Sequence, residues 1–528
     1  MIAPWWRGAI LYQIYVRSWI DSNGDGIGDL PGVILGLDHL ASLGVEGIWL
    51  SPITVSPDAD WGYDVSDYCR VQDVLGDLGD VDALIREAGA RGIRVLLDLV
   101  PNHTSERHPW FIDSRSSRSS RHRDWYVWAD PGPGRSPPNN WLSAFGGSAW
   151  TFDNRTGQFY LHNFLPSQPD LNWWNEEVRA AFDAILRFWF DRGVAGFRID
   201  VAHAMIKDLE LRDNPPILEE DHPQLRRLGQ RPLYNMNRPE VHDVLRSWRS
   251  IADEYDPPRV LIGETWVLDL NAMAAFYGTG RDELHMAFNF PFLFSPFEAV
   301  ALRHMVESTE ASIPKEGWPV WTLSNHDAGR FPTRWCDEDD VRTACALMAL
   351  LTLRGTPVLY YGDEIGMGQT VLPFEHLRDA VSMRDWPESS RDGARTPMQW
   401  SPGAGAGFTR AGVIPWLRFG DHLARNVARQ RSDPSSLLSL CRDLAGLRRS
   451  RADLRYGAYE SLPAPAGIWA WRRGSRVAVA LNLGDEGALL EGLDGTVLIG
   501  TSRERDGESL DGGLSLRPSE GVVVELRR

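Results

Sequence analysis

Cysteine is scarce in this sequence, and long apolar runs are absent. Only four cysteines occur among 528 residues, at positions 69, 336, 345 and 441, and no two of them have CxxC spacing. This pattern favours free thiols in a reducing compartment over a disulfide framework. The chain contains no run of eighteen apolar residues and no basic-then-apolar leader, which argues against a transmembrane helix and a signal peptide. We therefore expect a cytoplasmic protein without a membrane partner.

Basic residues are also fewer than acidic residues. The 72 acidic residues outnumber the 55 lysines and arginines, so the formal net charge is −17, and lysine occurs only at positions 207 and 315. A nucleic-acid partner requires a basic surface that neutralises phosphates, so this composition argues against one. Whether the chain is a monomer or a homo-oligomer is left open by the sequence.

Apolar β-like segments alternate with amphipathic helical segments along most of the chain. The expected helices include residues 31–44, 80–92 and 436–451. The expected strands are residues 9–19, 47–52, 94–100, 196–201, 259–266, 284–290, 318–325 and 356–366. Eight such units predict an α/β fold with a closed (β/α)8 TIM barrel.

Two regions depart from this alternation. Residues 103–171 are rich in Trp, Pro, Gly, Ser and Asn and lack a helical period, which is typical of an inserted functional subdomain. Short alternating segments separated by Gly, Asp and Asn turns follow the last helix and predict a C-terminal antiparallel β domain. The predicted barrel therefore comprises residues 1–102 and 172–452, with an insertion at 103–171 and a C-terminal domain at 453–528.

Acidic residues end three of the predicted strands. Asp200, Glu264 and Asp327 follow the fourth, fifth and seventh strands, where barrel enzymes carry their chemistry. A single carboxylate there is often only a helix cap, but three of them converge on one cavity. With His103 and His326 they could form a metal cluster.

Arg198 favours a different interpretation. It lies two residues before Asp200, so both side chains point to the same face of the strand. A guanidinium there competes with a metal cation and keeps Asp200 ionised. An ionised Asp beside a Glu of raised pKa is the pair that retaining glycoside hydrolysis requires.

Several motifs together resemble those of one enzyme family. The stretches DLVPNH (98–103), GFRIDVA (196–202), GETW (263–266) and SNHD (324–327) resemble, in this order, four motif regions of the α-amylase family, glycoside hydrolase family 13. The stretch QPDLN (168–172) resembles a fifth region. WWRGAILYQIYVRSW, DSNGDGIGDLPG, GYDVSDY and RDGARTPMQW are similar to the α-glucosidase and oligo-1,6-glucosidase branch.

The resemblance implies a role for each candidate site residue. Asp200 would be the nucleophile, Glu264 the acid and then the base, and Asp327 the residue that grips the sugar's 2- and 3-hydroxyls. Asp60 and Arg391 would close the pocket beyond the non-reducing end, so that only a terminal glucose is released. The substrate-binding residues would be Asp60, Tyr63, His103, Phe145, Phe164, Arg198, His326 and Arg391. Arg395 would lie near the same loop, where a purely structural ion-pair role is the alternative.

The loop DSNGDGIGDL (21–30) begins like a calcium-binding EF-hand loop, but Gly32 stands where that loop needs its closing Glu. By the family resemblance it would hold a structural Ca²⁺, or Mg²⁺ with more waters. The alternative is a solvated Asp/Gly turn. The implied ligands are Asp21, Asn23, Asp25, the carbonyl of Ile27, and Asp29.

The linkage preference is ambiguous in the sequence. Val201, directly after the nucleophile, resembles enzymes that cleave α-1,6 linkages, whereas Ala202 and His203 resemble maltose-accepting α-glucosidases. We expect a retaining, exo-acting α-glucosidase that acts on short α-glucosides such as maltose, maltooligosaccharides and sucrose. An oligo-1,6-glucosidase, or an α-glucosyltransferase or sucrose isomerase with the same covalent intermediate, is the alternative. A trehalose-6-phosphate hydrolase would need basic residues near the acceptor site, and the sequence shows no lysine cluster. A non-catalytic barrel is disfavoured by the intact carboxylate triad and by the lack of a transmembrane segment.

Overall fold

Eight parallel strands form the centre of the molecule. The computed structural model describes residues 3–386 and 390–527. The strand order is β11-β10-β9-β5-β2-β1-β13-β12, and a parallel bridge between Phe288 and Val320 joins the two edges into a closed barrel. The strands are β1 (Leu11–Ile14), β2 (Gly47–Leu50), β5 (Arg94–Leu99), β9 (Gly196–Ile199), β10 (Val260–Gly263), β11 (Met286–Ala287), β12 (Val320–Thr322) and β13 (Thr356–Tyr360).

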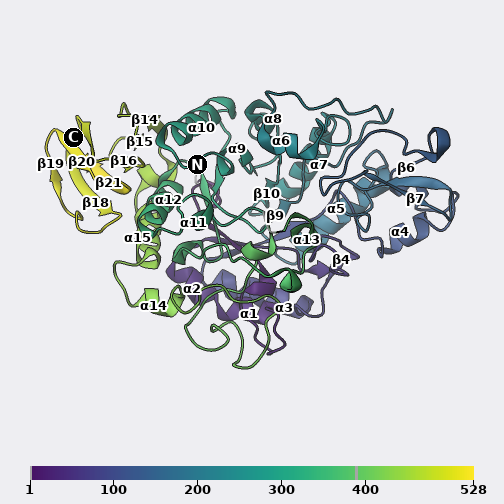
Figure 1. Ribbon diagram of the computed structural model, residues 1–528, viewed down its shortest axis with the longest axis horizontal. Helices are drawn as coiled ribbons and strands as arrows, with labels where there is room; N and C mark the ends of the chain where they lie inside the picture. The colour runs from purple at the N-terminus through teal and green to yellow at the C-terminus, as the bar shows by residue number, and fades with distance from the viewer. Residues whose placement is uncertain (1–2, 387–389, 528) are drawn as a thin grey trace.

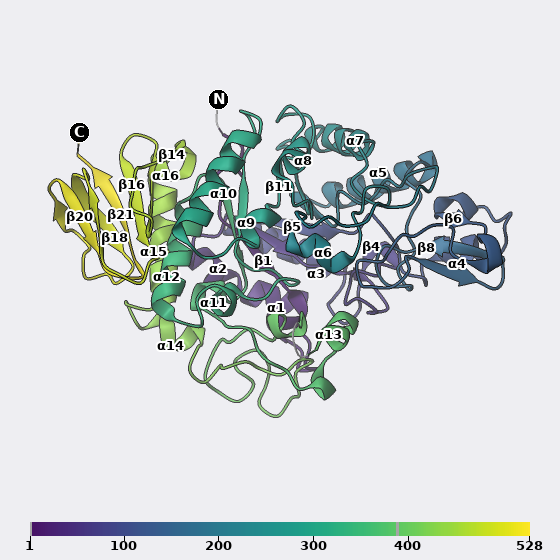
Figure 2. The ribbon, with the colours of Figure 1, turned by 45° about the horizontal axis from the view of Figure 1, so that its top comes forward.

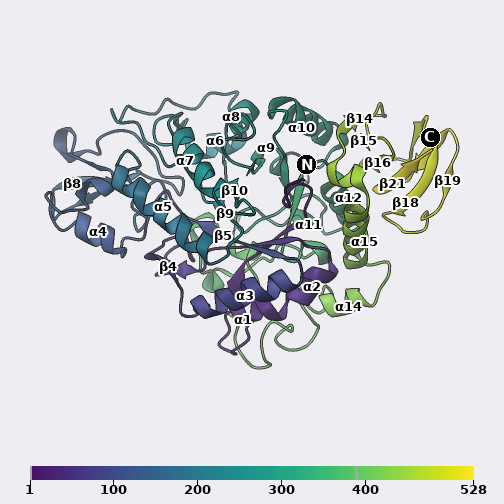
Figure 3. The ribbon, with the colours of Figure 1, turned by 180° about the vertical axis from the view of Figure 1, so that it is seen from behind.

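Helices surround these strands, as Figures 1 and 3 show. Each carries a buried apolar face, and in α5 that face consists of Val178, Phe182, Ile185, Leu186, Trp189 and Phe190. The helices that follow or precede the strands are α1 (Leu30–Leu35), α2 (Leu37–Ser42), α3 (Leu78–Ala90), α5 (Glu176–Asp191), α7 (Val241–Asp253), α10 (Ala299–Ser312), α12 (Asp340–Thr352) and α15 (Leu437–Ser450). The predicted (β/α)8 barrel is confirmed.

Two smaller β structures lie at opposite ends of the molecule, right and left in Figure 1 and again in Figure 2. The first is a sheet of β6 (Trp128–Ala129), β8 (Gln158–Leu161) and β7 (Trp150–Asp153). Antiparallel bridges between His103 and Asp170 and between Tyr126 and Leu171 lie where this excursion leaves and rejoins the barrel. The second is a six-stranded sheet in the order β14 (Tyr459–Ser461), β15 (Ile468–Arg473), β16 (Val477–Asn482), β21 (Glu520–Leu526), β18 (Gly495–Gly500) and β19 (Ser509–Leu510).

Two expected elements near the N-terminus differ in the structure. The strand expected at 9–19 ends at Ile14, and a 3-10 turn at Val16–Ser18 follows it. The helix expected at 31–44 is divided into α1 and α2, which meet at Gly36. The Trp19 indole lies so close to Gly36 that an added Cβ would be 2.4 Å from its nitrogen. Glycine is therefore required at this junction.

The structure also bears on the cysteines and on the question of a membrane-spanning helix. Cys69, Cys336, Cys345 and Cys441 are all free, as the sequence predicts. Over residues 3–386 and 390–527, every helix is too short or too polar to pass through a bilayer.

Candidate active site

The first two acidic residues lie side by side at one rim of the barrel. β9 and β10 pair in parallel with Ile199 opposite Gly263, so Asp200 and Glu264, the next residue of each strand, are neighbours. The guanidinium of Arg198 contacts both: Nη1 lies 2.7 Å from Asp200 Oδ1, and Nη2 lies 2.7 Å from Glu264 Oε2. Two carboxyl groups therefore face one another across a single cation.

A third carboxylate, that of Asp98, fixes Arg198. Asp98 in β5 is in register with Arg198 in β9, and its Oδ1 accepts a hydrogen bond of 2.8 Å from Arg198 Nη1. Its Oδ2 accepts hydrogen bonds from the Tyr63 hydroxyl (3.0 Å) and the Trp49 indole (3.1 Å). Burial raises the pKa of Asp98 to about 6, although the charge of Arg198 opposes this.

Burial is also the largest influence on Asp200. It raises the pKa of this carboxyl well above its usual range; Arg198 opposes the shift, and the charge of Glu264 adds to it. Burial thus opposes the ionised Asp200 that the sequence predicts, and the charge of Arg198 favours it. Repulsion between two neighbouring carboxylates means that the pair favours holding one proton.

The backbone is strained at Val201, directly after Asp200, and the Val201 N–H contacts Glu264. Val201 has φ +35°, a left-handed conformation that is unfavourable for a β-branched residue. In this conformation its N–H donates a 3.0 Å hydrogen bond to Glu264 Oε2, the oxygen that Arg198 also contacts. Because Oε2 already accepts from two donors, Oε1 is the Glu264 oxygen without a partner among these contacts.

Asp327 belongs to a network of charges beside this pair. Its Oδ2 lies 3.0 Å from His326 Nε2, and its Oδ1 accepts from Arg391 Nη1 (3.0 Å) and Arg395 Nη2 (2.9 Å). The removal of the carboxyl from bulk water would raise its pKa, although 36% of the side chain remains accessible. The close contact with His326 and the charges of Arg391 and Arg395 outweigh this effect and hold the pKa of Asp327 well below its usual range. Asp327 is therefore ionised.

His326 is positioned by the first strand. Its Nδ1 lies 2.9 Å from the amide nitrogen of Gln13, and its ring stacks on Tyr63 with centroids 5.1 Å apart and planes at 1°. Burial lowers the pKa of His326, which favours the neutral ring. If the Gln13 amide donates to Nδ1, the ring proton lies on Nε2, the nitrogen next to Asp327.

Asp60 and Arg391 meet at the other side of the site. Arg391 Nη2 donates to Asp60 Oδ1 at 2.8 Å, and the amide of Gln168 donates to Asp60 Oδ2 at 3.0 Å. The same Gln168 nitrogen lies 3.1 Å from His103 Nε2, which also lies 3.0 Å from the carbonyl of Tyr63. Burial lowers the pKa of His103 to about 4, so its ring is neutral near pH 7.

Two phenylalanines flank this group. The rings of Phe145 and Phe164 are 5.4 Å apart, Arg391 lies 5.1 Å from the Phe145 centroid, and Phe164 lies 5.2 Å from the His103 ring. The structure thus connects the predicted catalytic and substrate-binding residues through direct contacts. The metal-loop residues are not part of these contacts.

Sequence reasoning missed several members of the site. Gln13 carried a signal, because a fully buried polar residue within an apolar strand needs a partner. Gln168 opens the motif QPDLN without having been assigned a role. Asp379, which contacts both Arg391 and Arg395, lies in an irregular stretch and had no recognisable pattern.

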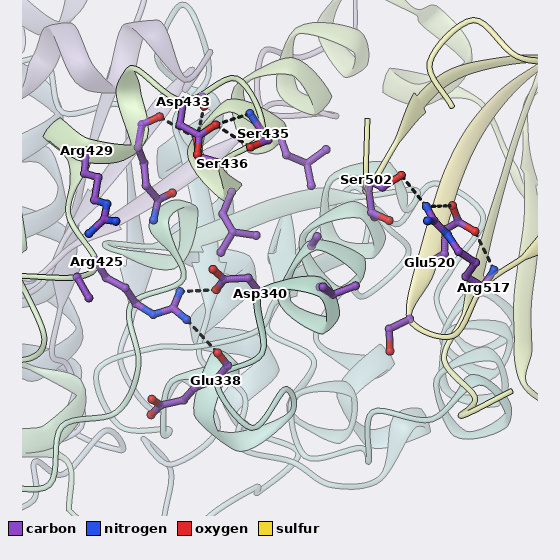
Figure 4. Close-up of a pocket in the computed structure, with 18 of the residues that line it drawn as sticks. Glu338, Asp340, Arg425, Arg429, Asp433, Ser435, Ser436, Ser502, Arg517 and Glu520 are labelled. Atoms are coloured by element: carbon purple, nitrogen blue, oxygen red, sulfur yellow. Dashed lines mark hydrogen bonds and ion pairs between the residues drawn. The ribbon is translucent and has the colours of Figure 1, made fainter. Parts of the chain in front are cut away.

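A hollow of about 290 Å³ opens beside Asp327. Its lining includes Gln369, Val371, Leu372 and Trp386, from the segment after β13. A cavity of about 890 Å³ lies elsewhere, between α12, α15 and the C-terminal sheet (Figure 4). Charges of both signs line it, among them Asp340, which pairs with Arg425, and Glu520, which pairs with Arg517. This second cavity contains none of the carboxylates described above.

The loop at 21–29 is closed by its own side chains. Asp21 accepts hydrogen bonds from the N–H groups of Gly24 (2.6 Å) and Gly26 (2.9 Å), and Asp29 Oδ1 accepts one from Gly32 (2.6 Å) at the start of α1. Among the residues that the structure describes, no three His, Cys, Asp or Glu side chains form a group that could hold a metal ion.

The donor chemistry of this loop nevertheless suits a hard cation. Asp21 and Asp29 are 5% and 3% exposed, and within the described ranges neither forms an ion pair with Arg, Lys or His. Burial raises the pKa of Asp29, and the nearby charge of Asp21 adds to this. Asn23 and Asp25 are exposed beside them. Two buried, mutually repelling carboxylates with further oxygen donors fit Ca²⁺.

Comparisons with known proteins agree with this geometry. The chain is 42% identical over 508 residues to a probable alpha-glucosidase of Rhizobium meliloti strain 1021, covering 92% of this chain and 91% of the relative. It is 35% identical to an oligo-1,6-glucosidase of Heyndrickxia coagulans over the full length of both. The solved structure of an alpha-glucosyl transfer enzyme, XgtA, superposes with a TM-score of 0.93 at 40% identity and covers all of both chains. The alpha amylase catalytic-domain family matches residues 13–457, and the chain therefore belongs to the α-amylase family of glycoside hydrolases.

Proposed function

We propose that this protein is a retaining, exo-acting α-glucosidase that releases terminal glucose from short α-glucosides. The observation that carries the proposal is the guanidinium of Arg198, which contacts Asp200 and Glu264 together. Retaining glycosidases need two carboxyl groups about 5–5.5 Å apart, one ionised and one protonated. A buried pair that favours holding one proton can supply both forms, and we assign the proton to Glu264 because only an ionised Asp200 can attack.

The hydrogen bonds assign the individual oxygens. Arg198 binds Oδ1 of Asp200, so Oδ2 would attack the anomeric carbon as the glycosidic C–O bond breaks. The proton on Glu264 Oε1 passes to the departing oxygen. In the second step Glu264 removes a proton from water, the water oxygen bonds to the anomeric carbon, and the bond to Asp200 breaks.

The ionised Asp327 would bind sugar hydroxyls and stabilise the positive charge that develops on the ring. The contact between Asp60 and Arg391 supports the exo activity, because it places a pair of charged hydrogen-bonding groups where the non-reducing end would lie. A chain extended beyond that glucose would have to break this ion pair.

Two alternatives use the same covalent intermediate. An oligo-1,6-glucosidase would differ in the linkage it accepts, and a glucosyltransferase or sucrose isomerase would pass the glucosyl group to another sugar hydroxyl instead of water. The similarity to a glucosyl transfer enzyme supports the transfer alternative without favouring it over hydrolysis.

The substrate range and the chemistry can be tested together. The wild-type protein is incubated separately with maltose, isomaltose, sucrose and trehalose, and the anomer of the released glucose is followed by NMR. We expect α-glucose first, because two inversions give retention. Products longer than the substrate at high sugar concentration would identify transfer.

Asp200→Asn tests the nucleophile. We expect kcat/KM to fall by at least about 10³-fold on every sugar cleaved, since covalent catalysis is lost. The matched control is Asp243→Asn, on the exposed side of α7, which should retain wild-type activity. Near-normal turnover by Asp200→Asn would refute the assignment.

We also propose that the loop at 21–29 holds a structural Ca²⁺ ion, with Mg²⁺ as the alternative occupant. The two buried carboxylates without a cationic partner support this proposal. A cytoplasmic location is proposed on the four free thiols.

A further inference from the structure

One buried carboxylate beside the proposed sugar pocket has no role in the chemistry above. Asp379 is 1% exposed and is the residue before the short helix α13 (Ala380–Asp385). Its Oδ2 accepts hydrogen bonds from the N–H (2.7 Å) and the hydroxyl (3.0 Å) of Ser382. Asp379 therefore caps this helix, which is one explanation for its presence.

Capping alone does not account for its other contacts. Asp379 grips Arg391 with both oxygens: Oδ2 lies 3.1 Å from Nε, and Oδ1 forms a second, short contact with Nη2. Arg395 Nη1 lies 3.8 Å from Oδ1. Burial would raise the pKa of Asp379, but the charges of Arg391 and Arg395 and its hydrogen bonds hold the pKa well below the usual range.

This two-point grip fixes the plane of the Arg391 guanidinium. The donors of arginine are arranged as a rigid fork, so when Nε and Nη2 are held, the direction of Nη1 is also determined. Nη1 then reaches Asp327 at 3.0 Å, and Nη2 reaches Asp60 at 2.8 Å. One guanidinium thus connects the carboxylate assigned to the transition state with the carboxylate at the closed end of the pocket.

We propose that Asp379 is a positioning residue that acts through Arg391 to set Asp60 and Asp327 for the terminal glucose. This inference rests on the proposed function. Without the Asp379 charge, Arg391 keeps only single-point contacts with Asp60 and Asp327, and its plane is no longer fixed. A displacement of about 1 Å at such a site is sufficient to cost on the order of 10²-fold in rate.

Asp379→Asn separates positioning from capping. Asparagine is as good an N-cap as aspartate, so the variant keeps the cap and loses only the buried charge that Arg391 and Arg395 contact. We expect kcat/KM for maltose to fall on the order of 10–100-fold. Asp269→Asn is the matched control: Asp269 caps the equally short α8 (Leu270–Ala275) and forms no ion pair within the described residues, so activity should be unchanged.

A double-mutant cycle with Arg391→Ala identifies the route. If Asp379 acts through Arg391, the double variant should lose no more activity than Arg391→Ala alone. Losses that multiply, or an Asp379→Asn variant as active as the wild type, would overturn the proposal. A wild type that cleaves no α-glucoside would instead refute the proposed function.

Arg391→Lys provides a second test if Asp379→Asn does not fold. It keeps the positive charge but lacks the fork, and a single ammonium cannot reproduce the two-point grip on Asp379. We expect a loss of kcat/KM of similar size, and full activity in this variant would also overturn the proposal.

Discussion

At the scale of single residues, the buried Lys207 connects separate segments of the chain through an ion pair and hydrogen bonds. Its Nζ lies 3.0 Å from Asp170 Oδ2, 2.6 Å from Asn102 Oδ1 and 2.7 Å from the carbonyl of Ala204. Burial lowers the pKa of Lys207, and the charge of Asp170 opposes this. The contacts connect the loop after β9 to both ends of the excursion at 103–171.

Lys207→Met should therefore be strongly destabilising. The change leaves Asp170 buried without its cation, and the loss of one partner of a buried ion pair costs about 3–5 kcal/mol. Urea unfolding measures the effect. The matched control is the other lysine of the chain, in Lys315→Met, because Lys315 is exposed and should tolerate the change. Equal stability of the two variants would show that the Lys207 contacts contribute little.

At the scale of secondary-structure elements, the loop before α1 offers a prediction on metal removal. A cation that binds only the folded protein stabilises it by mass action, by about 2.7 kcal/mol at a hundred times its Kd. We expect a chelator to lower the melting temperature and millimolar Ca²⁺ to restore it. Asp25→Ala removes an exposed oxygen donor and should abolish the response to calcium. Identical melting of the wild type with chelator and with calcium would contradict the proposal, and recovery with Mg²⁺ alone would change the assigned ion.

Among the secondary-structure elements, some strands could be predicted from the sequence, whereas a break between two helices could not. β5 and β9 are buried on both faces. The apolar content of residues 94–100 identified β5, and the alternation with helices identified β9, which placed Asp98, Asp200 and Arg198 near the ends of these two strands. The break at Gly36 depends on Trp19, which packs against it from a different element, and no local pattern reports such a contact.

The irregular segments set the limit of prediction within the site. Asp379 meets Arg391 because the segment after β13 folds back over the barrel, and neither residue lies in a strand or a long helix. Periodicity carries no information there, and only the motif RDGARTPMQW identified Arg391. No sequence pattern identifies its partner, Asp379.

At the scale of the whole molecule, buried histidines should make the fold sensitive to acid. Burial lowers the pKa of His103 to about 4, that of His108 to about 3 and that of His203 to about 4. An unfolded histidine titrates near pH 6.5, so below that pH the unfolded chain binds protons that the folded chain does not. The free energy of unfolding should therefore be fully retained above pH 6.5 and fall as the pH drops toward about 4.

His108→Asn isolates one of these contributions away from the proposed active site. The His108 ring nitrogen accepts a 3.1 Å hydrogen bond from the Trp110 N–H at the start of α4 (Pro109–Ser114), and asparagine can replace this cap without titrating. Between pH 7 and pH 5 the variant should lose about 2 kcal/mol less unfolding free energy than the wild type, measured by urea unfolding at each pH. His304→Asn, at an exposed position on α10, is the control for the same substitution outside the protein interior. If His108→Asn loses as much stability as the wild type over this range, burial of that ring does not oppose its protonation, and the acid sensitivity must originate in other groups.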